Sequence, residues 1–311
     1  MHPRVLALTT AAAVTACALG MTIATGLRVE LSHLLLWAAG ICVLFALQAF
    51  YTFYRREPFI ADSLGTLAVT GCSLTMLGVL ALAGLAVNAP LIDGALIRAD
   101  EMIGLDARTI VAFVSRVPAL HDPLVFAYHA SFKVLIFVPL ILILMRRADA
   151  AWRFCAMIAL AGFTCVVIAI PFPAIGAFAG LQLAEDVVSQ LPEGAGLYHL
   201  ATFDAFRSGT TKHVRLSELN GVITFPSFHA AFACVTAHVF MSLRILPVRL
   251  LRLSILIWTA IVMVSTIVIG GHYFVDVFAG VALFAVVVSI TRTRKPSPDL
   301  SMPLRALNPA T

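Results

Sequence analysis

Two short polar stretches in an otherwise apolar chain hold the residues best suited to chemistry. The first, "FPSFHAAFA", places Pro226, Ser227 and His229 at the start of an apolar run. Proline is favoured in the first turn of a helix, where its missing N–H is no loss. The free backbone N–H groups and the dipole of such a turn bind anions. A hydroxyl and an imidazole at this place therefore predict a helix start that holds a phosphate, with a simple N-cap by Ser227 as the alternative.

The second stretch, "GGHYFVDVFAG", contains His272 and Asp276. Residues four apart share a face of a helix, so the imidazole and the carboxylate can interact. Asp276 is the only carboxylate between Glu218 and Asp299. A carboxylate at the centre of a membrane helix costs about 2.5–3.5 kcal/mol on insertion scales, and it usually has a partner and a function. The pair indicates a functional site, with structural contact between helices as the alternative.

The composition places both stretches in a membrane protein. Of the 311 residues, 61% are hydrophobic and 12% are charged, and the mean hydropathy is +0.99, which excludes an ordinary soluble domain. A helix needs about 20 mostly apolar residues to cross the hydrocarbon core. The sequence predicts an all-α polytopic membrane helix bundle of about eight transmembrane helices. They cover residues 5–25, 32–53, 63–88, 124–145, 154–171, 222–243, 253–271 and 274–290.

The first of these stretches could instead be a signal segment, since "MHPR" precedes a run of small residues. We favour a transmembrane helix, because no polar processing region follows it. The last two stretches are separated only by a Gly-Gly-His break, which leaves their common boundary open.

The placement of lysine and arginine predicts the orientation of the chain. With a cytoplasmic N-terminus, more of these residues lie on the cytoplasmic side, and they crowd the helix ends, as Arg244, Arg249 and Arg252 do. We therefore expect an integral protein of a bacterial inner or cell membrane with both termini cytoplasmic. The helix starts that carry His229 and His272 then lie at one depth, which puts the site on the outer face.

Two long segments are expected on that outer face. Residues 89–123 have an apolar repeat at helical spacing and predict one helix lying along the membrane surface. Residues 172–221 contain short helical candidates broken by Pro192 and Gly209. The tail after Arg292 is rich in proline and serine, and we expect it to be disordered.

The cysteines and the net charge limit the kinds of site. All six cysteines lie in predicted helices and have neither paired loop spacing nor neighbouring histidines, which argues against disulfides and zinc sites. We expect no metal and no other cofactor. The net charge of +5 suits anionic lipid, and its placement indicates topology rather than nucleic-acid binding.

The two polar stretches together resemble the type 2 phosphatidic acid phosphatase superfamily. The family motifs Pro-Ser-x-His and Ser-Arg-x5-His-x3-Asp are matched in order by "PSFH" and by "STIVIGGHYFVD", where Ser265, His272 and Asp276 keep the family spacing. Thr266 stands where the second motif has arginine, and the upstream Lys-x6-Arg-Pro motif has no counterpart. In these respects the chain looks like the inositolphosphorylceramide synthase and inositolphosphotransferase branch.

The resemblance implies a membrane-embedded phosphatase or phosphotransferase core over residues 61–292, built on six helices. Residues 1–60 would then form additional N-terminal transmembrane helices, and residues 293–311 a cytoplasmic tail.

The resemblance also implies a mechanism that needs no metal. His272 would attack phosphorus and form a phosphohistidine. Asp276 would fix the tautomer of that imidazole and stabilise its cation. His229 would protonate the departing alkoxide and then take a proton from the incoming hydroxyl.

Phosphoryl transfer also requires groups that face the non-bridging oxygens. Bacterial relatives of this branch have an Arg-x-Gly before the Pro-Ser-x-His helix, and "FRSG" supplies Arg207 at that place. Lys133 in "HASFKVLIFVP" is a second candidate, with snorkelling from the outer end of its helix as the alternative. Ser227 completes the predicted phosphate-binding set. Lys212 and Arg215 are alternatives in the same loop, with an exposed, solvated loop face as their default explanation.

The expected substrate is a membrane phospholipid or lipid phosphate. An alcohol as acceptor makes the protein a phosphotransferase, whereas water makes it a lipid phosphate phosphatase, and both activities share the three catalytic residues. A membrane transporter is the alternative of another class, but it would place polar groups near the midplane in duplicated broken helices. We expect no nucleic-acid partner, and the sequence indicates no oligomeric state.

Overall fold

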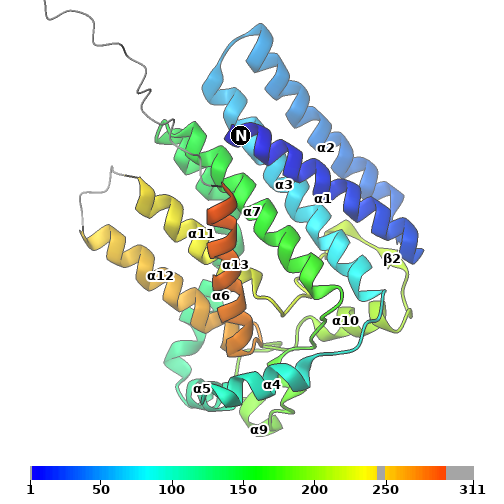
Figure 1. Cartoon of the computed structure of the whole chain (residues 1–311), viewed down its shortest axis with the longest axis vertical. Helices are drawn as coiled ribbons and strands as arrows, with labels where there is room; N and C mark the ends of the chain where they lie inside the picture. The colour runs from blue at the N-terminus through cyan, green and yellow to red at the C-terminus, as the bar shows by residue number, and fades with distance from the viewer. Residues whose placement is uncertain (1, 244–248, 292–311) are drawn as a thin grey trace, which may run out of the picture.

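The computed structural model describes residues 2–243 and 249–291 of the chain, which are mainly helical (Figure 1). Each predicted apolar stretch overlaps one long helix, and the all-α polytopic bundle is confirmed. The long helices are α1 (Pro3–Thr25), α2 (Leu31–Ala49), α3 (Pro58–Leu85), α6 (His121–Leu144), α7 (Ala148–Ala169), α11 (Phe228–Ser242), α12 (Arg249–Val268) and α13 (Phe274–Thr291).

Six of the described helices are long and apolar enough to cross a membrane. They include α1, α3, α6, α7 and α13, and also α2 with its π-helical extension Phe50–Tyr54. The helices α11 and α12 are apolar but shorter, over Phe228–Ser242 and Arg252–Val268. The predicted tail at 293–311 and Arg244 lie outside the described residues.

Proline and glycine mark the ends of several helices. Pro3 and Pro58 occupy the first position of α1 and α3, where the missing N–H is not needed. Helix α1 ends at Gly26, whose left-handed backbone, with φ of 67°, lets the chain turn towards α2. These residues set where α1 and α3 begin and where α1 ends.

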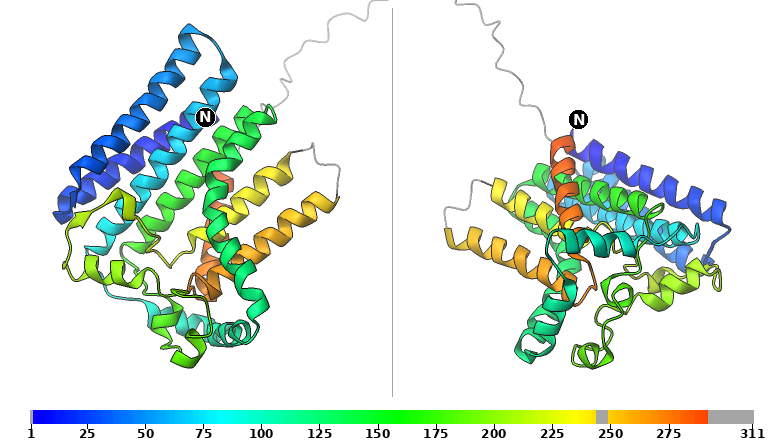
Figure 2. Two further views of the ribbon diagram at one scale, coloured as in Figure 1. Left: turned by 180° about the vertical axis from the view of Figure 1, so that it is seen from behind. Right: turned by 60° about the horizontal axis from the view of Figure 1, so that its bottom comes forward.

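Helix α7 lies at the centre of the bundle, in contact with α1, α3, α6, α11 and α13. Helix α2 packs on α3 at the outside, and α12 packs on α6 and α11 (Figure 2). The core therefore continues from α3 through α7 to the helices that begin at the two polar stretches.

Shorter elements gather at one end of the bundle (Figure 1). The helices among them are α4 (Asp93–Met102), α5 (Ala107–Ser115), α8 (Ala177–Gly180), α9 (Glu185–Val188) and α10 (Leu200–Arg207), with 3-10 turns at Pro118–Leu120 and Leu216–Glu218. The strands β1 (Arg28–Val29) and β2 (His213–Val214) pair in parallel and tie the α1–α2 turn to the loop before α11. Helices α11 and α13 both begin at this end.

The single surface helix predicted over residues 89–123 is wrong. The chain forms α4 and α5 instead, because Gly104 turns with a φ of 72° and Asp106 then caps α5 by accepting a hydrogen bond from the N–H of Arg108 at 2.9 Å. An apolar repeat continues across such a break, so periodicity alone does not reveal it.

Candidate active site

The start of α11 is bonded to the first turn of α13. The backbone N–H of Ser227 donates to the carbonyl oxygen of Asp276 at 3.0 Å. Gly280 permits this approach, because a Cβ at that position would lie 2.3 Å from the carbonyl oxygen of Ser227. The N-cap of α11 is Ser227, so Pro226 precedes the cap and does not occupy the first turn as expected.

The hydroxyl of Ser227 caps its own helix. It accepts a hydrogen bond from the N–H of Ala230 at 3.3 Å, and Ser227 is fully buried. The hydroxyl therefore has the N-cap role that was the alternative to phosphate binding. A contribution of Ser227 to phosphate binding stays a prediction.

His272 follows a tight turn between α12 and α13. Gly271 in this turn has a φ of 73°, and a Cβ there would lie 2.8 Å from the carbonyl oxygen of Gly196, so the turn requires glycine. Nδ1 of His272 lies 3.3 Å from Oδ2 of Asp276, and both side chains are buried. The contact has the distance of an ion pair, although the ring N–H is not aligned for a hydrogen bond. His272 precedes α13, so only Asp276 lies in the helix.

His229 packs among aromatic rings. Its imidazole stacks on the ring of Tyr128, with centroids 4.5 Å apart and planes inclined by 18°, and meets the ring of Phe132 edge-on at 4.7 Å. The ring of His272 lies 6.3 Å away. Nε2 of His229 is buried and has no hydrogen-bond partner among the described residues. The fold thus brings the two predicted histidines together.

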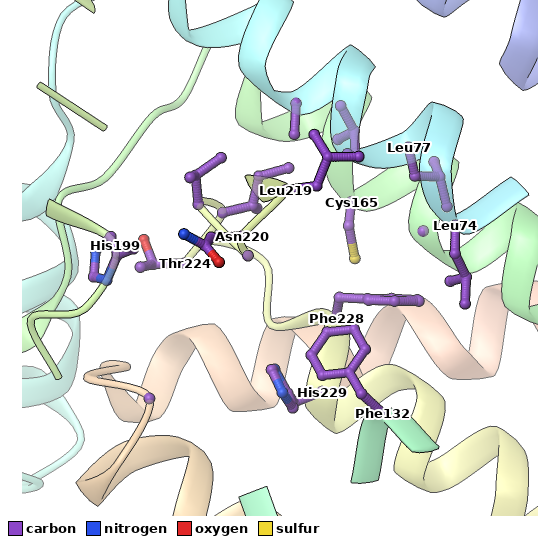
Figure 3. A pocket seen from close by; sticks show the side chains of 18 of the residues that line it. Leu74, Leu77, Phe132, Cys165, His199, Leu219, Asn220, Thr224, Phe228 and His229 are labelled. Atoms are coloured by element: carbon purple, nitrogen blue, oxygen red, sulfur yellow. The ribbon is translucent and has the colours of Figure 1, made fainter. Parts of the chain in front are cut away.

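The two histidines line one cavity of about 160 Å³. Figure 3 shows this cavity with His229 among the labelled residues. One wall is apolar and comes from α3, α7, Leu219 and residues 221–223, including Leu74, Leu77 and Cys165. The polar lining besides the histidines of the two motifs consists of Tyr128, Tyr198, His199, Asn220 and Thr224. Asp276 does not line the cavity and is fully buried beside His272.

Arg207 and Lys133, the cations predicted to bind phosphate, lie outside the lining of this cavity. Nη2 of Arg207 donates to the carbonyl oxygen of Ala89 at 2.9 Å, and the guanidinium lies over the ring of Phe203. Its Nη1 is buried without a hydrogen-bond partner among the described residues. Lys133 is exposed on α6. No lysine or arginine of the described ranges lines the cavity.

Ser265 and Thr266 of the second motif are buried in α12. Each hydroxyl donates to the carbonyl oxygen of Val262, at 2.8 Å and 2.7 Å. The threonine that replaces the family arginine therefore bonds within its own helix.

Sequence reasoning missed His199, a third histidine of the cavity. Its Nε2 lies 2.8 Å from the carbonyl oxygen of Ile175, and it is buried. Burial lowers the pKa of His199, nearby His272 lowers it further, and the hydrogen bond to Ile175 opposes both effects. The only signal in the sequence is the adjacent pair of polar aromatic residues in "LYHLATF".

Its neighbour Tyr198 was missed as well. The hydroxyl of Tyr198 forms a hydrogen bond with that of Tyr128, the residue that stacks on His229. Burial raises the pKa of Tyr198, so its phenol stays a neutral donor.

Sequence reasoning also missed two carboxylates of α4, whose hydrogen-bond partners lie far away in the sequence. Asp93 and Asp100 are buried at 8% and 3% exposure, on the same face of α4 as Leu96. Asp100 bonds to backbone N–H groups just after His272, and Asp93 bonds to the loop at Ile175 and Gly176 and to the hydroxyl of Tyr273; neither carboxylate lines the cavity.

Metal-ligating side chains are scattered in the part of the chain that the structure describes. No three His, Cys, Asp or Glu residues there are grouped closely enough to hold a metal ion, and all six cysteines are free thiols.

The chain matches a protein-family model. A family model described as the PAP2 superfamily matches residues 94–290, which is more than half of the chain and includes both polar stretches. No curated protein and no solved structure matches the chain.

Proposed function

The chain belongs to the PAP2 superfamily, and we propose that it is a membrane phosphotransferase that acts on a lipid phosphate ester through a phosphohistidine. Membership in this superfamily supports a phosphatase-type lipid phosphoesterase. The observation that carries the finer proposal is the meeting of His229 and His272 at one cavity, with Asp276 against the second ring.

His272 is the proposed nucleophile. Asp276 lies 3.3 Å from Nδ1, which favours a proton on that nitrogen and leaves Nε2 free to attack phosphorus. A bond forms between Nε2 and phosphorus while the bond from phosphorus to the leaving oxygen breaks. The imidazole then carries a positive charge that the carboxylate of Asp276 stabilises.

His229 is the proposed acid and base. Its Nε2 has no hydrogen-bond partner among the described residues, so it is free to give a proton to the departing alkoxide. The neutral ring then accepts a proton from the incoming hydroxyl, whose oxygen takes phosphorus from His272. Each histidine returns to its starting state at the end of one turnover.

The N-terminus of α11 and one cation are the proposed partners of the non-bridging oxygens. The first-turn N–H groups and the dipole of a helix favour an anion. Arg207 is the first candidate, because its Nη1 is a buried donor without a partner in the described part of the chain. Lys133 is the second candidate, and reaching the phosphate from its exposed place would require a movement of α6.

The resemblance to the inositolphosphotransferase branch favours an alcohol as acceptor, and hydrolysis is the second candidate. The apolar wall formed by α3 and α7 supports a lipid as donor, since an acyl or prenyl chain would exclude water from it. We further propose that the cavity opens on the outer side of a bacterial membrane, with both termini cytoplasmic.

The purified protein should be assayed with labelled lipid phosphates and phospholipids, with and without polyols or other free alcohols. Phosphate transfer to an alcohol supports the phosphotransferase, release of inorganic phosphate alone supports the phosphatase, and no turnover of any phosphate ester contradicts both. Activity should persist in chelator, because the two histidines supply both covalent and acid–base catalysis. Loss in chelator with recovery in magnesium would overturn that part of the proposal.

A further inference from the structure

Helix α4 lies near the start of α13 (Figure 1). Its two buried carboxylates, Asp93 and Asp100, bond to residues 273–275, which follow His272. Asp93 and Asp100 are seven residues apart, which is close to two helical turns, so both lie on one side of α4. The described residues give them only backbone N–H groups and one tyrosine hydroxyl as hydrogen-bond partners.

Asp100 binds the first two amides of α13. Its Oδ2 accepts from the N–H of Phe274 at 3.0 Å, and its Oδ1 accepts from the N–H of Val275 at 2.8 Å. The preceding N–H, that of Tyr273, donates to Oδ2 of Asp276 at 3.0 Å. First-turn N–H groups have no partner within their own helix, so two carboxylates hold three successive amides next to His272.

Asp93 binds the loop that packs against this segment, together with the side chain of Tyr273. Its carboxylate accepts from the N–H groups of Ile175 and Gly176 at 3.0 to 3.1 Å, and its Oδ1 accepts from the hydroxyl of Tyr273 at 3.0 Å. The next amide of that loop, at Ala177, donates to the carbonyl oxygen of Gly271 at 2.6 Å. Helix α4 thus holds the backbone after His272 directly through Asp100, and it holds the backbone before His272 indirectly, through the loop that Asp93 binds.

We propose that Asp93 and Asp100 are positioning residues that hold His272 in register with Asp276 and His229. The proposal rests on the proposed function, because it assigns the two carboxylates to the orientation of the nucleophile. Neither residue lines the cavity, so neither touches the substrate. Loss of either should therefore lower kcat and leave KM nearly unchanged.

A purely structural role makes a different prediction. If the carboxylates only cap α13, their loss lowers the thermal stability and leaves the kcat of the folded fraction intact. The ring of His272 would keep its environment in that case. The two roles are therefore separable by kinetics and by the magnetic resonance signal of the ring.

The variants are Asp100→Asn, which keeps the shape but accepts only one of the two amides well, and Tyr273→Phe, which removes only the hydroxyl bound to Asp93. Tyr273→Phe is the milder change and keeps the test available if Asp100→Asn fails to fold. Glu101→Gln is the matched control, because Glu101 is the exposed neighbour of Asp100 on α4. Each protein is purified in detergent, and kcat, KM and the ring signals of isotope-labelled histidines are measured.

We expect kcat to fall at least about tenfold in Asp100→Asn and about threefold or more in Tyr273→Phe, with KM within about twofold and no change in Glu101→Gln. The ring signal of His272, assigned with His272→Gln, should shift in both variants. Wild-type kcat together with an unshifted His272 signal would overturn the proposal. The ring signal is measured even if the protein turns over no phosphate ester, so failure of the proposed function and failure of the positioning role are distinguishable.

Discussion

The imidazoles of His229 and His272 lie 6.3 Å apart between centroids and are inclined by 72°, although the whole of α12 separates them in the sequence. Both rings line the same cavity, so we expect a phosphoryl group bound there to meet the proposed nucleophile and the proposed acid. In-line displacement needs such an arrangement, because the attacking and leaving atoms lie on opposite sides of phosphorus.

Tyr128 should hold the ring of His229 by stacking. We expect Tyr128→Leu to lower kcat at least about tenfold, roughly 1.4 kcal/mol of transition-state stabilisation, because the imidazole loses its flat support. Tyr128→Phe keeps the stack and loses only the hydrogen bond to Tyr198, so its kcat should stay within about threefold. Phe137→Leu, an exposed aromatic on the same helix, is the control for steady-state kinetics. Full activity in Tyr128→Leu would contradict the role of the stack.

Arg207 should contribute to transition-state binding. A guanidinium grips two phosphate oxygens at once, and a lysine does not reproduce this geometry, so Arg207→Lys should lower kcat/KM at least about tenfold, roughly 1.4 kcal/mol. A thermal melt of the same variant measures the separate loss of the hydrogen bond to Ala89. If Arg207→Lys keeps its kcat/KM and Lys133→Ala does not, then Lys133 on α6 binds the phosphate instead of Arg207.

Because His199 is buried, the free energy of unfolding should fall in weakly acidic solution. Burial lowers its pKa in the folded protein, so the unfolded chain binds the proton more readily than the fold does. The stabilisation is complete above the ordinary histidine pKa of about 6.5 and is lost as the pH falls below it. The charges of His272, Asp204 and Asp93 also affect the pKa of His199. The two proteins compared should therefore differ only at residue 199.

The measurement is the melting temperature between about pH 5 and pH 8 for wild type and His199→Gln. Glutamine can still donate to the carbonyl oxygen of Ile175 but does not titrate in this range, so its curve should be flatter. Equal slopes for the two proteins would contradict this account.

The sequence was most informative where local chemistry decides the structure. Long apolar runs located all eight long helices. The run predicted over 222–243 was too long at its start, because Val222 is apolar and buried in a loop beside the cavity rather than in α11. Hydropathy does not distinguish a buried loop from the first turns of a helix.

The site was only partly predictable for a related reason. The motif spacing made His229, His272 and Asp276 the candidate catalytic residues, and the fold brings the three together. The bonds from Asp100 to Phe274 and from Asp93 to Tyr273 join residues that are far apart in the sequence. No periodicity within one segment encodes such contacts, and only the fold brings them together.

The proposed orientation is tested with one accessible residue in the loop before α11. A cysteine at Ser217, which is exposed, in a background without the six native cysteines should react with an impermeant thiol reagent on intact cells. Thr224 is less suitable, because it is buried and its hydroxyl donates to the carbonyl oxygen of Ala174. A cysteine at Arg55, in the turn between α2 and α3, should react only after permeabilisation. The opposite pattern would invert the topology.

The covalent intermediate gives the most direct test of the central claim. The protein is mixed with a lipid phosphate labelled in its phosphoryl group, quenched in alkali within one turnover, and digested for mass spectrometry. We predict a phosphoryl group that is stable in alkali and labile in acid on the peptide that contains His272, and its complete absence in His272→Ala. A phosphoryl group on any other residue, or turnover at the wild-type rate in His272→Ala, would contradict the phosphohistidine mechanism.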